Sequence, residues 1–216
     1  MNGRLRFEIA ISADGYVAGP NQSEEHPLGE GGTRLHDWVV KLDAWRRSHG
    51  KEGGGEVNPS NEVIAEAMTG IGAVIMGRGM FGGGPGPWGE APWRGWWGED
   101  PPFHVPVFVL THHRREPLRM DGGTTFHFVT DGIESALALA REAAHGEDVR
   151  LGGGASAAQQ YLAAGLIDEM QLNVVPILLG GGERLFENVG DRLALEQDRV
   201  VHTDEVTHIR YRVSTR

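Results

Sequence analysis

The hydrophobic pattern changes period along the chain and predicts strands that alternate with helices. Residues 4–12 (RLRFEIAIS) alternate between polar and apolar positions, as a half-buried strand does. Short continuous apolar runs, typical of strands covered on both faces, lie at 73–76, 107–110 and 126–129. Further strands are predicted at 148–151 and 169–178, and the alternating segments 193–199 and 206–213 predict an antiparallel hairpin.

Apolar residues at helical spacing lie between these predicted strands. Residues 34–49 place five apolar side chains on one helical face, namely Leu35, Trp38, Val39, Leu42 and Trp45. Other helices are predicted at 61–69 with Ser60 as N-cap, at 133–144 with Asp131 as N-cap, and at 155–164. Residues 13–33, 51–59 and 79–106 are loops rich in Gly and Pro. We therefore predict one α/β domain over 1–216, with a mostly parallel central sheet, flanking helices and an antiparallel C-terminal edge.

Composition removes several classes of function. The 216 residues include no cysteine, which excludes disulfides, and together with the lack of an H-E-x-x-H motif this predicts no metal site. A formal charge of −10 argues against a nucleic-acid partner. No run approaches the roughly 20 apolar residues of a membrane span, and the N-terminus leads directly into a strand pattern, so we expect no membrane association and a cytoplasmic location.

A glycine triplet lies between the predicted strand at 148–151 and the predicted helix at 155–164. Helix N-termini bind anions through exposed amides, and glycine allows a diphosphate to approach the backbone. The run fits the dinucleotide pattern G-x-G-x-x-A, but Gln171 stands about where a Rossmann domain has its acidic ribose ligand. The triplet predicts either a diphosphate site outside a standard Rossmann domain or a turn in which glycine serves packing alone.

Two more predicted strands end in residues suited to phosphate. The run at 73–76 leads into Gly77 and Arg78, and the run at 107–110 leads into Thr111, His112 and Arg114. Open α/β sheets bind ligands at the carboxyl ends of their strands, and guanidinium groups form charge-assisted hydrogen bonds with phosphate. A solvated surface side chain is the alternative for Arg78.

Five stretches taken together resemble the dihydrofolate reductase superfamily, and most of all its riboflavin-biosynthesis reductase branch, the RibD C-terminal domain, with its stand-alone bacterial relatives. They are ISADGYVAGP, VIMGRGMF, PVFVLTHHRREP, VRLGGGASAAQQYL and LIDEMQLNVVPILLGGGERLF, and they span most of the chain in the order of that family. One position departs from the resemblance. Family members often carry Thr two places after the Arg that corresponds to Arg78, whereas Met80 stands here.

The resemblance implies NADPH as cofactor and assigns roles to individual positions. Gly77 and Arg78 correspond to residues that bind the NADPH phosphates, and the strand end at Thr111 corresponds to the part that reads the 2′-phosphate. The implied cofactor-binding residues are Ala10, Val17, Ala18, Gly77, Arg78, Thr111, His112, Arg114, Gly152, Gly153, Gly154, Ala155 and Ser156. The resemblance also implies a homodimer. The apolar strand at 169–178 and the pair Leu185 and Phe186 fit this expectation if they form an uncovered edge or patch. The alternative is that Leu185 and Phe186 fold back onto their own sheet.

The substrate end is less defined by the sequence. Asp37 is the catalytic candidate, with Asp43 and His36 nearby, although a solvated helix face explains each of them as well. Four tryptophans at 88, 93, 96 and 97 form either an aromatic wall for a flat heterocycle or a cover for the protein's own core. We expect Asp14 to form a turn. The predicted function is an NADPH-dependent reductase of a small pterin-like or aminopyrimidine-like molecule. The alternative is an inactive nucleotide-binding or regulatory protein on the same fold.

Overall fold

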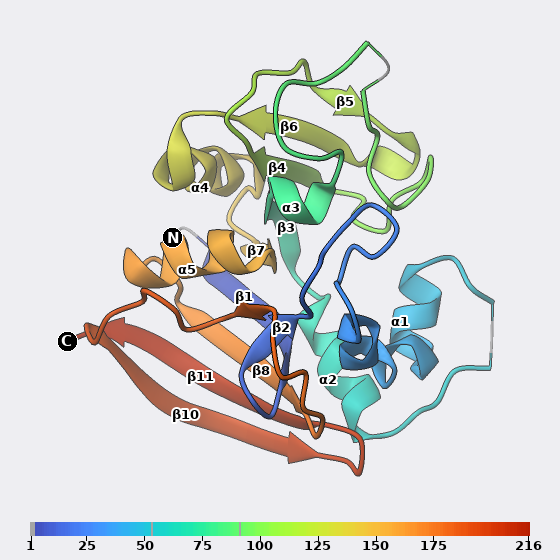
Figure 1. The fold of residues 1–216 in the computed structure, drawn as a ribbon, viewed down its shortest axis with the longest axis vertical. Coiled ribbons are helices and arrows are strands. Elements are labelled where there is room, and N and C mark those ends of the chain that lie inside the picture. Colours follow the sequence, from blue (N-terminus) through green and yellow to red (C-terminus); the bar gives the residue numbers. More distant parts are fainter. Residues whose placement is uncertain (1–2, 53, 91) are drawn as a thin grey trace.

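The computed structural model describes residues 3–52, 54–90 and 92–216. Its main sheet has nine strands in the order β10-β11-β8-β1-β7-β3-β4-β6-β5 (Figure 1). The strands are β1 (Leu5–Ser12), β2 (Tyr16–Ala18), β3 (Ile71–Gly77), β4 (Pro106–Leu110), β5 (Leu118–Arg119), β6 (Thr125–Val129), β7 (Asp148–Gly153), β8 (Glu169–Val175), β9 (Glu183–Arg184), β10 (Leu193–His202) and β11 (Thr207–Thr215). The six strands from β8 to β6 run parallel, whereas β10, β11 and β5 are antiparallel to their neighbours. This arrangement confirms the predicted fold class.

Helices cover both faces of the sheet. They are α1 (Asp43–Ser48), α2 (Pro59–Ala67), α3 (Arg78–Phe81), α4 (Gly132–Ala143) and α5 (Ala155–Ala163), with 3-10 turns at Gly32–His36, Val39–Lys41 and Asp121–Gly123. On one face, α4 and α5 place Leu137 and Tyr161 against Phe7 of β1. On the other face, the segment around α1 and α2 packs against Ala10 of β1. Each fully buried large side chain contributes roughly 1.5–3 kcal/mol, so these two cores fix the helices to the sheet.

The predicted helix at 34–49 is wrong as a continuous element. The chain forms two 3-10 turns and then α1, because Leu42 is extended at φ −72° and ψ 142°. Backbone hydrogen bonds between residues 41–43 and Glu56 replace the helical ones at this point. The apolar stripe is nevertheless buried, since Leu35 and Trp38 are 0% and 3% exposed. Helical spacing therefore identified the buried side chains but not the backbone that carries them.

Two predicted caps differ from the structure. The helix predicted at 61–69 begins at Pro59, and its N-cap is Asn58, whose side chain accepts a hydrogen bond from the amide of Asn61 at 3.2 Å. Ser60 is buried and instead bonds to His208. Asp131 occupies the N-cap position of α4, but its side chain makes no capping hydrogen bond there.

Other predicted boundaries differ from the observed ones where segments distant in sequence pair. The loop predicted at 13–33 contains β2, which pairs with β9. The strand predicted at 169–178 ends at Val175, and it lies between β1 and β11 rather than at an edge. Leu185 is fully buried, so the predicted uncovered edge and patch are wrong for this strand and for Leu185. No helix of the described ranges is long and apolar enough to cross a membrane.

Candidate functional site

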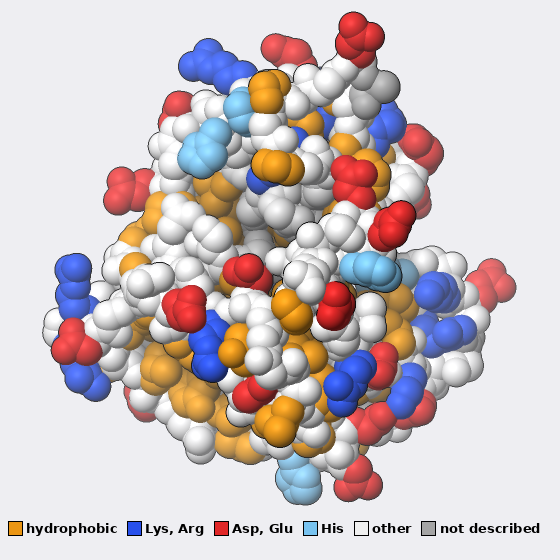
Figure 2. Space-filling view, in the orientation of Figure 1, with side chains coloured by type: hydrophobic (Ala, Val, Ile, Leu, Met, Phe, Trp, Pro, Cys, Tyr) orange, Lys and Arg blue, Asp and Glu red, His pale blue; other side chains and the backbone are white. Residues whose placement is uncertain are grey.

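The phosphate-binding motifs predicted from the sequence meet at one edge of the sheet. In the parallel register, Met76 of β3 pairs with Gly153 of β7, and Gly77 pairs with Leu110 of β4. The residues that follow these strands therefore lie next to one another, although they are up to about 80 positions apart in sequence. Figure 2 shows the surface hollowed near the middle of this face, beside α3, where backbone and uncharged atoms dominate.

The glycine turn leaves the start of α5 without a side-chain cap. Gly153 and Gly154 have φ values of +122° and +58°, a region that residues with a side chain rarely adopt. Gly154 is the N-cap residue, and because glycine has no side chain it cannot cap the amides of the first turn. The positive end of α5 is therefore open to an anion, as a diphosphate requires.

The start of α3 lies close to this turn. A Cβ atom added to Gly77 would stand 3.3 Å from Cβ of Ala157 and 3.7 Å from the carbonyl oxygen of Gly153. The thioether of Met80 packs on the turn, with its sulfur 3.3 Å from the position of a Cβ on Gly152. Met80 thus supplies an apolar contact at the position where the resemblance predicts a hydroxyl.

Arg78 is fixed by its own loop. Its guanidinium donates hydrogen bonds to the carbonyl oxygens of Gly82 and Gly83 at 3.1 and 3.0 Å. The group also stacks on Trp88, 3.1 Å from the ring centroid. Burial, with a smaller contribution from the nearby Arg115, lowers the pKa of Arg78. The side chain is held in one orientation, which reduces the entropy lost when it binds a phosphate.

The residues that follow β4 differ in their exposure to solvent. Thr111 is buried, and its hydroxyl oxygen accepts hydrogen bonds from Arg78 at 3.4 Å and from the amide of His113 at 3.2 Å. His112 and Arg114 are exposed at the same strand end. Thr111 therefore orients Arg78, whereas His112 and Arg114 have side chains that can reach a ligand.

The apolar residues near the β1–β2 turn are buried. Ala10, Val17 and Ala18 are 5–6% exposed, and Ala10 and Val17 pack in different apolar clusters. Asp14 connects this turn to the segment after β8, because its carboxylate accepts hydrogen bonds from the hydroxyl of Ser12 and the amides of Leu179 and Gly180. These hydrogen bonds lower the pKa of Asp14 to about 2. Asp14 is therefore a turn residue, as expected.

The two carboxylates considered for the substrate end differ in exposure, since Asp37 is exposed whereas the side chain of Asp43 is only 18% exposed. Asp37 is exposed at the end of the first 3-10 turn, and Asp43 forms an ion pair with Arg47 at 2.7 Å. His36 beside them is largely buried, which lowers the pKa of its imidazole, and its Nδ1 atom has no hydrogen-bond partner. A catalytic role for Asp37 stays a prediction.

The tryptophans of the loop 82–106 pack mainly on their own part of the molecule. Trp88, Trp93 and Trp97 contact the apolar cluster formed by β3, β4 and β6. The indole of Trp93 donates a hydrogen bond to the carbonyl oxygen of Phe81 at 2.8 Å, and Trp96 lies edge-on to Trp93. Of the two interpretations, the cover of the protein's own core is the one that these contacts favour.

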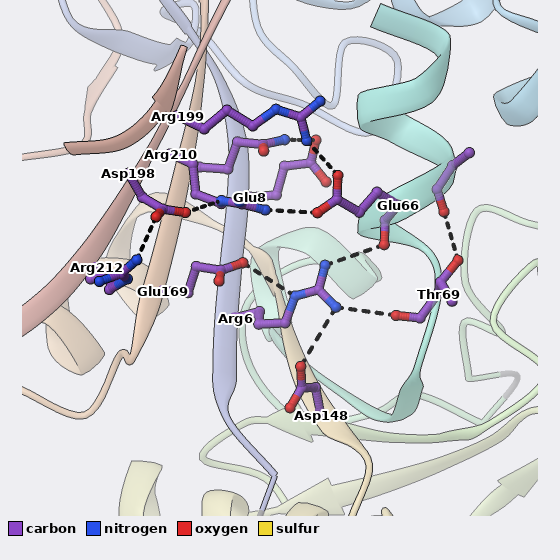
Figure 3. Close-up of polar contacts among 12 residues, drawn as sticks. Arg6, Glu8, Glu66, Thr69, Asp148, Glu169, Asp198, Arg199, Arg210 and Arg212 are labelled. Atoms are coloured by element: carbon purple, nitrogen blue, oxygen red, sulfur yellow. Dashed lines mark hydrogen bonds and ion pairs between the residues drawn. The ribbon is translucent and has the colours of Figure 1, made fainter. Parts of the chain in front are cut away.

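Sequence reasoning missed a set of partly buried charges on the other side of the same strands (Figure 3). Glu8 of β1 and Arg150 of β7 are half-buried. The signal was present in the alternating segment 4–12, where Arg4, Arg6 and Glu8 occupy every second position and so share one face. A pocket of about 20 Å³ is lined by Arg6, Glu8 and Arg150 among others, and an adjoining cavity of about 480 Å³ is lined by Arg4 and Arg6 but not by Glu8 or Arg150.

Comparisons with known proteins agree with this architecture. The family model of the RibD C-terminal domain matches residues 4–209. The protein YyaP of Bacillus subtilis is 24% identical over 198 residues, which cover 89% of this chain and 85% of that protein. Among solved structures, a "putative riboflavin biosynthesis protein" of Shewanella sp. PV-4 superposes with a TM-score of 0.61 at 22% identity and 99% coverage of both chains.

Two further solved structures share the fold at lower identity. A diaminohydroxyphosphoribosylaminopyrimidine deaminase/5-amino-6-(5-phosphoribosylamino)uracil reductase of Thermotoga maritima has a TM-score of 0.55 at 12% identity, over 98% of this chain and 56% of that longer one. Dihydrofolate reductase of Enterococcus faecalis, complexed with NADP(H), has a TM-score of 0.52 at 14% identity, over 99% and 98% of the two chains. Since the family model covers nearly the whole sequence, the chain belongs to the RibD C-terminal domain family, whose fold is that of dihydrofolate reductase.

Proposed function

We propose that this protein is an NADPH-dependent reductase that transfers a hydride to a small heterocyclic substrate of pterin-like or aminopyrimidine-like type. The observation that carries the proposal is the meeting of the Gly152–Gly154 turn, the open start of α5 and the Gly77–Arg78 strand end at one edge of the sheet. Family membership supports an oxidoreductase. The cofactor supplies the hydride, so the protein's task is to bind and align it.

The basic residues beside the turn support NADPH over NADH. Arg78 is oriented by Thr111, and His112 and Arg114 are exposed at the neighbouring strand end. Guanidinium and imidazole groups at this position suit a 2′-phosphate, whereas an acidic ribose ligand is missing from the sequence where a Rossmann domain has one. We assign contacts with the nicotinamide to Ala10, Val17 and Ala18, as the resemblance implies, and the diphosphate to residues 152–156.

The experiment that tests the proposal measures binding and turnover separately. Titration of the protein with NADPH and NADH should give tighter binding of NADPH. Oxidation of NADPH is then followed against a panel of pterins and aminopyrimidine ribitol compounds. Equal affinity for both cofactors would contradict the cofactor assignment.

The alternative is a nucleotide-binding protein without turnover. Two observations favour it, the exposed position of Asp37 and the ion pair of Asp43 with Arg47, which leave the proton donor undefined. NADPH binding with no oxidation across the substrate panel would support this alternative. Asp37→Asn should lower turnover if the carboxylate takes part in proton transfer.

We also propose a cytoplasmic homodimer, now on a different surface. The edge strand β10 has 10 residues, and its Leu195 and Val200 are 45% and 47% exposed. Apolar side chains gather on the lower left of the molecule over β10 and β11 (Figure 2). Pairing of this edge with a second copy would cover it. Light scattering should give twice 23.5 kDa, and Leu195→Glu combined with Val200→Glu should give the monomer.

A further inference from the structure

The Arg78 guanidinium keeps donors that its own loop does not use. Its Nε and Nη2 atoms donate to the carbonyl oxygens of Gly82 and Gly83 at 3.1 and 3.0 Å, and Nη1 donates to the hydroxyl of Thr111 at 3.4 Å. A guanidinium has five N–H donors, so about two of them, on the Nη atoms, stay available. No ion pair joins Arg78 to a carboxylate in the described part of the chain. Arg78 therefore retains both charge and donors for an anionic ligand.

A tryptophan ring holds the flat face of this guanidinium. The Cζ atom of Arg78 lies 3.1 Å from the ring centroid of Trp88, and both side chains are half-buried. At this separation two flat groups can only lie face to face. The ring therefore fixes the plane of the guanidinium and leaves its N–H edge free, which is why an arginine can stack on a ring and bind a phosphate at the same time.

Trp88 itself is fixed to the end of β4 and to the core. Its indole N–H donates to the carbonyl oxygen of His113 at 3.0 Å. Its ring lies edge-on to Phe81 and Phe128, with centroids 5.8 and 5.0 Å apart. The Cζ atom of Arg115 lies 4.6 Å from the centroid of the same ring. Since these contacts come from α3, β6 and the segment after β4, the tertiary structure sets the plane of the Trp88 ring.

Two other tryptophans of the same loop fix the backbone that Arg78 binds. A Cβ atom added to Gly82 would stand 2.7 Å from ring atoms of Trp96, and one added to Gly83 would stand 2.6 Å from Cβ of Trp93. These close approaches require glycine, and they place the two carbonyl oxygens that accept hydrogen bonds from Arg78. Trp93 and Trp96 thus act on the main chain, whereas Trp88 contacts the guanidinium directly.

The indole of Trp88 also offsets a repulsion between two cations. Burial lowers the pKa of Arg78, and the nearby Arg115 lowers it further. Neither guanidinium has a carboxylate partner among the described residues, although both lie against the ring of Trp88. The negative face of an aromatic ring attracts a cation, so the ring stabilises this arrangement until a phosphate supplies a full negative charge.

We propose that Trp88 is a positioning residue of the cofactor site, which holds Arg78 in the orientation that binds the 2′-phosphate and thereby sets the preference for NADPH over NADH. The inference rests on the proposed reductase function, and it assigns no contact between Trp88 and the cofactor. Without the ring, the guanidinium must be ordered when the phosphate binds, and that loss of side-chain entropy weakens the complex. NADH has no 2′-phosphate and does not need the ordered guanidinium.

The test measures the dissociation constants of NADPH and NADH by isothermal titration calorimetry with the full chain. Trp88→Leu removes the flat ring and keeps an apolar side chain. It should reduce the ratio of the NADH Kd to the NADPH Kd about threefold to tenfold, the range expected from a partly buried cation–π contact, through weaker binding of NADPH alone. Trp88→Phe keeps a ring face and should retain most of the ratio. Trp88→Gln, which keeps an N–H donor but no ring, should lose as much as Trp88→Leu and replaces it if that variant does not fold.

Two controls separate positioning from loop packing. Trp97→Leu makes the same change in the same loop, but Trp97 packs against Phe103 and Phe126 instead of Arg78. It should lower the midpoint of thermal unfolding and leave the ratio unchanged. In the Arg78→Ala background, Trp88→Leu should have no further effect on the ratio, because a residue that acts through Arg78 then has nothing left to position.

The role of Trp88 is overturned if Trp88→Leu keeps the ratio of the parent, or if Trp97→Leu or Trp88→Phe loses as much as Trp88→Leu does. An additive effect of Trp88→Leu in the Arg78→Ala background would overturn it as well. Circular dichroism reports whether each variant is folded. A parent that binds both cofactors equally contradicts the proposed NADPH dependence and this role with it, whereas a preference that survives in Trp88→Leu contradicts the role of Trp88 alone.

Discussion

The two ends of the same parallel strands differ in how their polar groups are satisfied. At the carboxyl ends of β7 and β3, glycines leave the first amides of α5 without a side-chain partner. At the amino ends, Arg4 bonds to Asp148 at 3.0 Å and to Glu169 at 2.8 Å, so side chains neutralise one another. The first end offers backbone groups to a ligand, whereas at the second end the charged side chains pair with one another. Substitutions should therefore affect binding at the carboxyl ends and have small effects at the exposed amino ends.

The largest effect is expected from Gly153→Val. A branched side chain at φ +122° strains the turn by about 1–3 kcal/mol and stands where the diphosphate must approach the backbone. We expect NADPH affinity to fall at least about hundredfold, a loss of about 2.7 kcal/mol or more, while circular dichroism still reports a folded protein. Gly89→Val, at a glycine with open space around it, should bind like the parent. Normal NADPH binding by Gly153→Val would mean that the glycines serve packing only.

The hydrogen-bonded side chains of Ser60, Asn173 and His208 should make the free energy of unfolding depend on pH. The imidazole of His208 lies between Asn173 and Ser60, at 2.7 and 2.8 Å, and burial lowers its pKa to about 4. The unfolded state takes up a proton near pH 6.5 and the folded state only near pH 4. Stability is therefore complete above about pH 6.5 and falls as the pH drops towards 4, by at most about 3 kcal/mol. Urea unfolding should show this slope in the parent and a smaller one in His208→Gln; equal slopes would contradict the assignment.

Arg78→Ala tests the side-chain contribution at the carboxyl ends. Loss of a charge-assisted contact to phosphate costs roughly 1.5–3 kcal/mol, which corresponds to an NADPH preference over NADH reduced about tenfold to hundredfold. The ratio of the two dissociation constants measures it. Arg94→Ala, in the same loop but paired with Glu99, is the matched control and should preserve the ratio. A preference that survives Arg78→Ala would transfer the role to His112 and Arg114.

The smallest effect is expected from Arg4→Gln. Its side chain is 57% exposed, and exposed ion pairs contribute from nothing to about 1 kcal/mol. The free energy of unfolding, measured with a chemical denaturant, should therefore change by less than about 1 kcal/mol, and the affinity for NADPH should not change. A loss of several kcal/mol would show that the amino-end network stabilises the sheet far more than exposed pairs usually do.

The sequence predicted most strands and the helices α4 and α5 within a few residues, because their hydrophobic period is a local property. It also predicted which motifs end strands, and parallel order then required them to share an edge. It could not predict the break at Leu42, since helical spacing of Leu35 and Trp38 is preserved although the backbone turns to pair with Glu56. Nor could it place Ser60, whose hydroxyl bonds to His208, 148 positions away.

By itself the sequence determined the α/β class, the face of each strand that is buried and the glycine-rich ends proposed for the cofactor, because each depends on neighbouring residues. The tertiary structure alone decided that β8 lies inside the sheet, that Leu185 is buried, and that Glu8 and Arg150 line one pocket. These features depend on register between segments about 140 or more residues apart. Register is set by packing of the whole sheet against its helices, which no local pattern records.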